Sequence, residues 1–162
     1  MPKVPFEQLP DDARLWVFGV SESPSPEASD ALLSLVDDYL AGWQAHGEPL
    51  TCARDWRDAR FLAVGVDQRS AGASGCSIDA LYRSLQQLER TLGATLLAGG
   101  RVFYRDTEGH VQCVDRATYA ARVHEGSIGG DTPVFDTTLT RVGDYRARFE
   151  RPASSSWHAQ LA

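Results

Sequence analysis

Two short apolar runs place the strongest constraint on the fold of this chain. Residues 15–20 and 60–66 carry apolar side chains at consecutive positions, apart from glycines and the leading arginine. A strand with one face in water instead alternates apolar and polar residues. Both runs are therefore predicted to be strands that are covered on both faces.

Two amphipathic segments are predicted to supply helices beside these strands. Apolar residues recur at spacings of three and four between residues 28 and 43, and again between residues 78 and 92. Ser25 is suited to cap the first helix, and Pro26 suits its first position. Gly47 is expected to end this helix.

The remaining strands complete an order of elements with a known topology. Residues 50–56 alternate weakly and predict an edge strand, whereas residues 102–104 and 111–114 predict a hairpin. The order β-α-β-β-α-β is that of ferredoxin-like folds, with the first and third strands in the centre. The predicted fold class is α+β, with a ferredoxin-like βαββαβ sheet and two helices. A longer antiparallel sheet with the same helices on one face is the alternative.

The C-terminal third has a pattern of its own. A strand leads to a helix that Asp115 is expected to cap and Gly126 to close, and residues 128–135 follow. This stretch resembles the small GYF-type adaptor module of bacterial proteins. The resemblance implies a β-α-β appendix packed on the main sheet, with a peptide-binding surface. We therefore divide the chain into a ferredoxin-like core at 1–109 and a small C-terminal extension at 110–162, which together form one compact unit.

Composition and charge exclude several classes of function. The chain of 162 residues has a formal net charge of −6 and a pI of about 5.1, and it holds no basic run. A nucleic-acid partner is therefore not expected. The N-terminus lacks the apolar core of a signal peptide, and no segment reaches the roughly 18 consecutive apolar residues of a membrane helix. We expect a cytoplasmic protein that does not contact membranes.

Motifs that bind metals or cofactors are missing from the sequence. Cys52, Cys76 and Cys113 are odd in number, far apart and outside CxxC pairs. This pattern argues for free thiols and against a structural zinc site. The glycine-rich stretch at 72–77 lacks the lysine and the spacing of a phosphate-binding P-loop. No metal and no cofactor are expected.

The loop at 67–79 is the predicted functional site. In the expected topology the first and third strands run parallel, so that both helix N-termini meet at one edge of the sheet. Backbone N–H groups at a helix N-terminus bind anions, and small residues let a ligand approach the backbone. Ser77 is expected to cap the second helix and Asp79 to complement its dipole, with a plain capped turn as the alternative. The expected ligand-binding residues are Arg69, Gly72, Ser74, Gly75, Ser77, Asp79 and Trp157.

Cys76 is the candidate nucleophile of this loop. A thiol near a helix N-terminus loses its proton more readily, and the thiolate is the reactive form. Such a nucleophile also needs a base. His46 is expected at the opposite edge of the sheet, whereas His158, in the tail beside Trp157, is free to fold back over the loop. The predicted catalytic residues are Cys76 and His158; the alternative is that Cys76 is a small buried hydrophobic residue.

A second resemblance is carried by positions that are spread over most of the chain. It comprises Trp43, His46-Gly47, Pro49-Leu50, Arg60-Phe61, the run from Ala71 to Asp79, Asp131-Thr132, Val134-Phe135 and Ser156-Trp157-His158. In these positions the chain resembles a group of small uncharacterised bacterial proteins, some of which carry the label "ABC transporter ATPase". The missing Walker motifs contradict that label. The resemblance supports the site positions and implies no reaction.

Two classes of function remain open from the sequence. The first is a binding protein for a small anionic ligand or a protein partner, including a homodimer formed through the edge strand and Trp56. The second is a thiol-dependent enzyme with Cys76 as nucleophile, His158 as base, and the amides of Gly75 and Ser77 as anion donors. The residues do not decide whether the protein is an enzyme.

Overall fold

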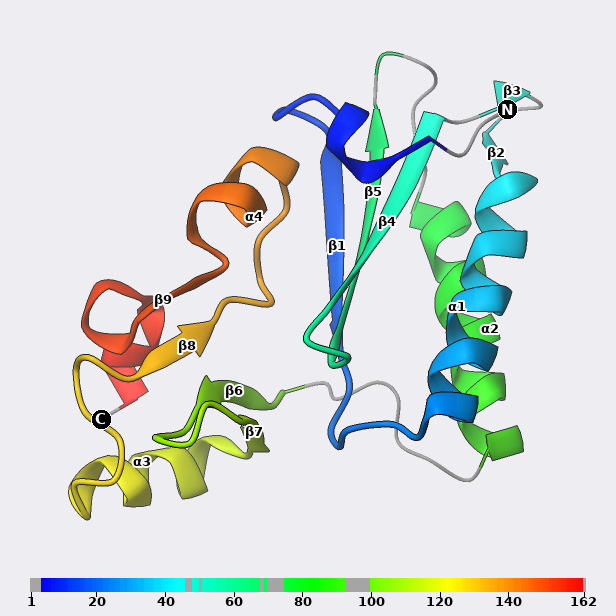
Figure 1. Ribbon diagram of the computed structural model, residues 1–162. Helices are drawn as coiled ribbons and strands as arrows, with labels where there is room; N and C mark the ends of the chain where they lie inside the picture. The colour runs from blue at the N-terminus through cyan, green and yellow to red at the C-terminus, as the bar shows by residue number, and fades with distance from the viewer. Residues whose placement is uncertain are drawn as a thin grey trace.

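The chain folds into two antiparallel sheets with helices around them (Figure 1). The structure, a computed structural model, describes residues 4–45, 48–49, 51–67, 69, 75–92 and 100–161. The strands are β1 (Arg14–Gly19), β2 (Gln44–Ala45), β3 (Glu48–Pro49), β4 (Thr51–Arg57), β5 (Phe61–Asp67), β6 (Val102–Arg105), β7 (Val111–Val114), β8 (Pro133–Phe135) and β9 (Glu150–Pro152). The helices are α1 (Pro26–Ala41), α2 (Gly75–Leu92), α3 (Arg116–His124) and α4 (Val142–Arg148), with 3-10 turns η1 (Phe6–Gln8), η2 (Ala153–Ser155) and η3 (Trp157–Leu161).

Three strands form the first sheet, in the order β1-β5-β4, and four form the second, in the order β7-β6-β8-β9. The mixed α+β class is therefore confirmed. The two-residue strands β2 and β3 pair only with each other.

Both long helices lie where the apolar spacing predicts them. Ser25 caps α1, because its Oγ accepts a hydrogen bond from the Ala28 N–H at 3.1 Å. α1 ends at Ala41, earlier than expected, since Gly42 takes the C-cap position and the chain then enters β2. Gly47, the predicted end of this helix, lies outside the described residues.

α1 and α2 cover one face of the first sheet, on the right in Figure 1. Apolar side chains from alternate positions of the strands meet the apolar stripes of the two helices. The buried members of this core are Val20, Leu32, Val36, Leu40, Trp43, Cys52, Leu62, Val64, Val66, Leu81 and Leu85.

The second sheet and α4 cover the other face of the first sheet. The Phe61 ring lies at the centre of this contact, with centroids 5.0 Å from Phe103, 4.7 Å from Phe135 and 5.0 Å from Phe149. Residues 61–66 of β5 are all buried. β5 is thus covered on both faces, as its continuous apolar pattern predicts.

The predicted position of the fourth strand is wrong. β6 does not join the first sheet beside β1 but pairs with β7 and β8 in the second sheet. This placement lets the Phe103 ring of β6 pack edge-on against Phe61, on the face of the first sheet rather than at its edge. The sheet order therefore differs from the ferredoxin-like one, and the division expected between residues 109 and 110 falls within the β6–β7 hairpin.

The predicted strand directions are also wrong. β1 and β5 are neighbours, as expected, but they run antiparallel, with Arg14 opposite Val66 and Gly19 opposite Phe61. α1 leads from β1 to β4, and the turn into β5 reverses the chain once more. The two helices consequently run in opposite directions, and α2 begins at the end of the molecule where α1 ends (Figure 1).

This arrangement removes one premise of the predicted site. The N-termini of α1 and α2 do not meet at one edge of the sheet (Figure 1). His46 lies outside the described residues.

The second sheet has a small core of its own, closed by α3. Asp115 caps α3, as predicted, because its Oδ1 accepts a hydrogen bond from the Thr118 N–H at 2.7 Å. Gly126 follows the helix with a φ of 84°, a conformation that favours glycine. The buried members of this core are Val102, Tyr104, Val114, Tyr119, Ile128, Val134 and Ala153.

Arg60 joins the two sheets through buried polar contacts. Its guanidinium donates hydrogen bonds to the carbonyls of Val20 at 3.1 Å, Ser21 at 2.9 Å and Val111 at 2.6 Å. Only 7% of Arg60 is exposed, and burial lowers the pKa of its guanidinium. Each of the three guanidinium nitrogens thus donates to a backbone carbonyl, so Arg60 has a structural role.

Candidate functional site

The start of α2 corrects two expectations for the 67–79 loop. Gly75 is the first helical residue, so Ser77 lies within the first turn and cannot be the cap. Asp79 is exposed and follows the first turn, beyond the range in which a carboxylate complements the helix dipole. Gly72 and Ser74 lie outside the described residues, and of Gly75 and Cys76 the structure describes the backbone alone.

Arg69 is engaged by its neighbour in the chain. Its Nε donates to Asp67 Oδ1 at 3.1 Å and a terminal nitrogen donates to Asp67 Oδ2 at 3.0 Å. These hydrogen bonds lower the pKa of the Asp67 carboxyl. Asp67 therefore largely neutralises the positive charge that Arg69 was predicted to offer to a ligand.

His158 and Trp157 do not reach this loop. His158 is 1% exposed and lies in η3, which packs on α3 on the opposite side of the molecule from α2 (Figure 1). The imidazole stacks on Trp157 at a centroid distance of 4.0 Å, and its Nδ1 shares a hydrogen bond with Ser156 Oγ at 2.8 Å. The tail buries its aromatic residues locally, so the structure does not bring Cys76 and His158 together.

Burial also changes the chemistry of His158. Desolvation lowers the pKa of His158 to about 4, against a smaller opposing effect of Asp136. Its Nε2 is buried and has no hydrogen-bond partner within the described part of the chain. A histidine that is neutral and enclosed in this way is a packing residue at neutral pH, and it has no access to a nucleophile elsewhere.

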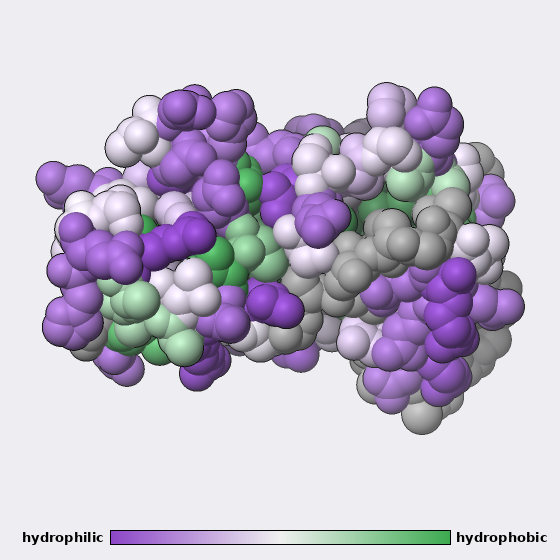
Figure 2. All heavy atoms as spheres, turned by 90° about the horizontal axis from the view of Figure 1, so that it is seen from below, coloured by the Kyte–Doolittle hydropathy of each residue, from purple (hydrophilic) through white to green (hydrophobic). Residues whose placement is uncertain are grey.

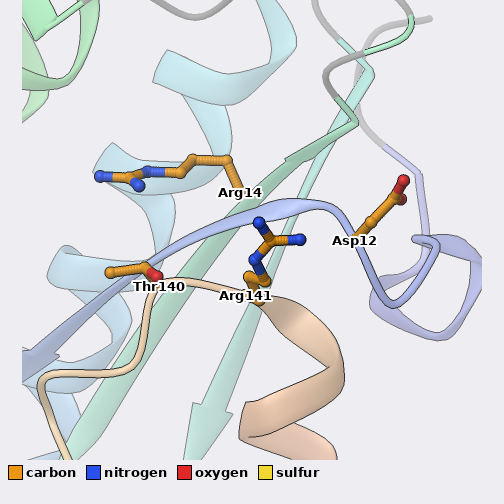
Figure 3. Close-up of a pocket in the computed structure, with 4 residues that line it drawn as sticks. All are labelled: Asp12, Arg14, Thr140 and Arg141. Carbon is orange, nitrogen blue, oxygen red and sulfur yellow. The ribbon is translucent and has the colours of Figure 1, made fainter.

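A polar pocket at the start of β1 brings together residues that the sequence pattern does not connect. Its volume is about 180 Å³, and Asp12, Arg14, Thr140 and Arg141 line it (Figure 3). Figure 3 shows the side chain of Arg141 between Arg14 on one side and Asp12 on the other. We call this feature the Arg14–Arg141 pocket.

Backbone pairing holds the two sides of the Arg14–Arg141 pocket together. Arg14 and Arg141 form an isolated antiparallel bridge. Beside it, the Leu15 N–H donates to the Thr140 carbonyl at 2.9 Å. The Val142 N–H donates to the carbonyl of Ala13, the residue before β1, at 3.1 Å. The segment before α4 thus lies along the outer edge of β1, at the place where a ferredoxin-like fold would put its fourth strand.

The two arginines of the pocket differ from the arginines around them. Arg146 donates to Asp11 Oδ1 at 2.8 Å, and Arg69 is paired with Asp67. Arg14 and Arg141 form no ion pair with any residue that the structure describes; the Arg14 guanidinium instead lies 5.3 Å from the centroid of the Trp16 ring. The positive charges of Arg14 and Arg141 are therefore not balanced by a described ion pair, unlike those of Arg146 and Arg69.

The pocket adjoins the predicted loop. Arg14 is opposite Val66, next to the last residue of β5, so the chain enters the 67–79 loop beside the pocket. Two carboxylates raise the pKa of Arg69, chiefly Asp67 and to a smaller extent Asp12 of the pocket. The loop predicted from the sequence thus lies at the same end of the sheet as the pocket, but the sequence pattern did not indicate Arg14 and Arg141. No local motif marks them, because their approach depends on the path of the segment before α4.

The two remaining thiols are poor nucleophiles. Cys52 is buried and its Sγ lies 3.5 Å from the Leu40 carbonyl, as a donor to it. Burial raises the pKa of the half-buried Cys113 thiol. Only Cys76, in the first turn of α2, has a position in the backbone that favours the thiolate.

The described part of the chain contains neither a metal-binding cluster nor a membrane-spanning helix. No group of three or more His, Cys, Asp or Glu side chains in that part of the chain is arranged to hold a metal ion. None of the helices described here is both long and apolar enough to cross a bilayer. Comparison with protein-family models, with curated proteins and with solved structures gives no significant match.

Proposed function

We propose that this protein binds a small oxyanion, and that the Arg14–Arg141 pocket is its binding site. The proposal keeps the function expected from the sequence, a protein that binds a small anionic ligand, and moves the site from the 67–79 loop to the neighbouring pocket. One observation carries it: two arginines from distant parts of the chain line one polar pocket, and neither is paired with a described carboxylate.

The chemistry of arginine supports an oxyanion as the ligand. The planar guanidinium offers parallel N–H donors that match carboxylate and phosphate oxygens, and it stays charged at all physiological pH values. Thr140, whose hydroxyl both donates and accepts, adds a third polar contact at the pocket wall. The lining supplies few apolar contacts, so it favours a ligand that is polar throughout.

The size of the pocket limits the ligand. A volume of about 180 Å³ is smaller than the roughly 300–1,000 Å³ typical of sites for drug-sized molecules. Phosphate and short carboxylates fit a pocket of this volume. The proposed ligand class is therefore the small inorganic or organic oxyanions.

Isothermal titration calorimetry with phosphate tests this proposal. The single variants Arg14→Gln and Arg141→Gln should each weaken phosphate binding at least tenfold, because each removes one charged donor pair. Arg90→Gln is the matched control, since Arg90 is an exposed arginine on α2. If Arg90→Gln weakens binding as much as the pocket variants do, the effect is one of net charge and the pocket is not the site.

A thiol-dependent enzyme is the second candidate. The start of α2 at Gly75 favours it, because Cys76 then occupies the first turn of an 18-residue helix, where a thiolate is stabilised. His158 is not offered as its base. Alkylation by iodoacetamide at pH 6.5, followed by mass spectrometry, should label Cys76 faster than Cys113; equal rates would remove this candidate.

A homodimer, a cytoplasmic location and membership of the small bacterial group remain predictions. Trp56 of the edge strand packs partly against the helix-side core and is half-buried, so it offers little of its ring to a partner. Tyr82 is the large hydrophobic side chain that is most clearly exposed among the described residues, at 39%. Figure 2 shows that polar side chains cover most of one face, with small separate apolar patches.

A further inference from the structure

We propose that two copies of this chain associate through the outer edge of β1, in antiparallel orientation, so that their three-stranded sheets join into one. The proposal goes beyond the proposed function and does not depend on anion binding. Two observations lie behind it. The middle of β1 is paired with no described strand on its outer side, and residues of opposite charge lie at its two ends.

The hydrogen bonds of β1 show where its outer edge is open. In an antiparallel strand the N–H and C=O of one residue point to the same side, and successive residues alternate between the two sides. The Leu15 N–H points outward, to the Thr140 carbonyl at 2.9 Å, and the Val20 N–H points inward, to the Arg60 carbonyl at 2.8 Å. The N–H and C=O of the half-buried Val17 therefore point outward, beyond the isolated bridge at the start of the strand.

The sequence of β1 lacks the features that keep an edge strand from pairing. Residues 16–19 contain neither a charged residue nor a proline. The opposite edge of the same sheet, β4, carries Arg54 and Arg57, and the N-terminal segment covers its start, where the Val4 N–H donates to the Cys52 carbonyl at 2.9 Å. Charges and covering segments of this kind protect sheet edges. Of the two edges, β1 is therefore the one suited to association.

Aromatic side chains lie beside the open edge. The Phe18 ring of β1 contacts the Tyr82 ring of α2, with a centroid distance of 6.2 Å. Tyr82 is 39% exposed and Phe18 is half-buried. A second sheet that continues from β1 would cover the exposed parts of these rings, and this burial of apolar area would stabilise the pair of chains.

The charges at the two ends of β1 favour a second copy of this chain as the partner. Arg14 and Arg141 lie at its start and have no ion pair with a described residue. Glu22 follows its end, is exposed, and likewise forms no ion pair within the described part of the chain. When two β1 strands pair antiparallel about a two-fold axis, the start of each strand lies beside the end of the other. The edge is thus complementary in charge to itself, and each basic end meets Glu22 of the second copy.

Analytical ultracentrifugation tests the proposal. The wild-type protein should form a dimer of twice the chain mass of 17.7 kDa. Val17→Pro removes the outward N–H and should weaken association at least tenfold, while the fold persists because proline is tolerated at a sheet edge where its N–H would face outward. Val17→Thr is the matched control, since it keeps both the N–H and a branched side chain, and it should associate like the wild type.

A charge exchange tests the orientation of the two strands. Glu22→Arg should weaken association at least tenfold, because it brings like charges together. The double variant Arg14→Glu with Glu22→Arg should recover most of that loss. Glu125→Arg is the control, since Glu125 is an exposed carboxylate after α3. Phosphate is left out of the buffer, because an anion in the Arg14–Arg141 pocket would compete with Glu22 for Arg14.

Three results would overturn the proposal. The first is a wild-type protein that stays monomeric up to millimolar concentration. The second is a dimer that persists in folded Val17→Pro, because another surface would then hold it together. If Val17→Pro does not fold, as judged by near-ultraviolet circular dichroism, Glu22→Arg decides, and a dimer that it leaves unchanged is the third. None of these results depends on phosphate binding, so the proposed function is tested separately.

Discussion

At the scale of single residues, the structure uses arginine in two distinct ways. Arg60 is buried, and each of its three guanidinium nitrogens donates to a backbone carbonyl. Arg14 and Arg141 line a pocket and have no described carboxylate partner. The same side chain thus serves the core in one place and offers an anion site in another, and the difference lies in the acceptors that surround it.

His158 leads to a prediction about stability and pH. Its pKa in the folded protein is about 4, below the ordinary value of 6.5, so protonation favours the unfolded chain. The contribution of His158 to stability should be constant above pH 6.5, fall as the pH drops from 6.5 to 4, and level off below 4. The total loss from this residue is at most roughly 3 kcal/mol, from about 1.4 kcal/mol for each pKa unit.

Urea denaturation at pH 7 and pH 4.5 measures this effect. His158→Phe keeps an aromatic ring without a titrating group, so the difference in unfolding free energy between the two pH values should shrink by about 1–3 kcal/mol. His110→Phe is the control, because His110 is exposed on a hairpin turn. An unchanged pH difference in His158→Phe would show that the buried imidazole does not carry the pH dependence.

At the scale of elements, the contact between β1 and β6 decides the architecture. A Cβ atom at Gly19 would overlap the ring of Phe103, so these two strands approach closely only because Gly19 lacks a side chain. This contact places β6 against the face of the first sheet instead of at its edge. In this position β6 pairs with β7 and β8 and departs from the ferredoxin-like order.

Gly19→Ala should therefore destabilise the protein by about 1–3 kcal/mol, as overpacking in a core does. Phe103→Leu in the Gly19→Ala background should recover part of that loss, because the smaller side chain makes room for the methyl group. Thermal unfolding of the two single variants and the double variant measures this coupling. Gly129→Ala is the control, since a Cβ there meets nothing within 4 Å, and its stability should change by less than about 0.5 kcal/mol.

The sequence predicted the individual helices and strands well but their arrangement in the fold poorly. Ser25 and Asp115 are local caps, and their roles are confirmed because a cap depends on the next three residues. The path of β6 depends on Gly19 and Phe103, which are far apart in the chain and carry no shared pattern. The Arg14–Arg141 pocket was missed for the same reason, since a bridge between distant segments creates it.

At the scale of the whole molecule, the first sheet is shared by both halves of the chain. One face supports the helices, and the other face packs on residues from the C-terminal part, including Phe135, Val142 and Phe149. Arg57 and Arg105 add ion pairs to Glu150, at 2.9 and 2.8 Å. The two halves should consequently unfold as one cooperative unit.

A chain truncated after residue 109 tests this cooperativity. It would lose β7 and β8, which are the partners of β6, together with β9, and would expose the Phe61 side of the first sheet. We expect the truncated chain to show no cooperative thermal transition in near-ultraviolet circular dichroism. A sharp transition would mean that residues 1–109 form an independent domain, contrary to the shared core.

The central claim is that the Arg14–Arg141 pocket binds a small oxyanion. The most direct measurement is a phosphate titration of the ¹⁵N-labelled protein followed by NMR, with the arginine side-chain Nε signals included. The account predicts saturable shifts that are largest at Arg14, Thr140 and Arg141. Saturable shifts confined to the amides of residues 75–79, or no saturable shift at all, would contradict it.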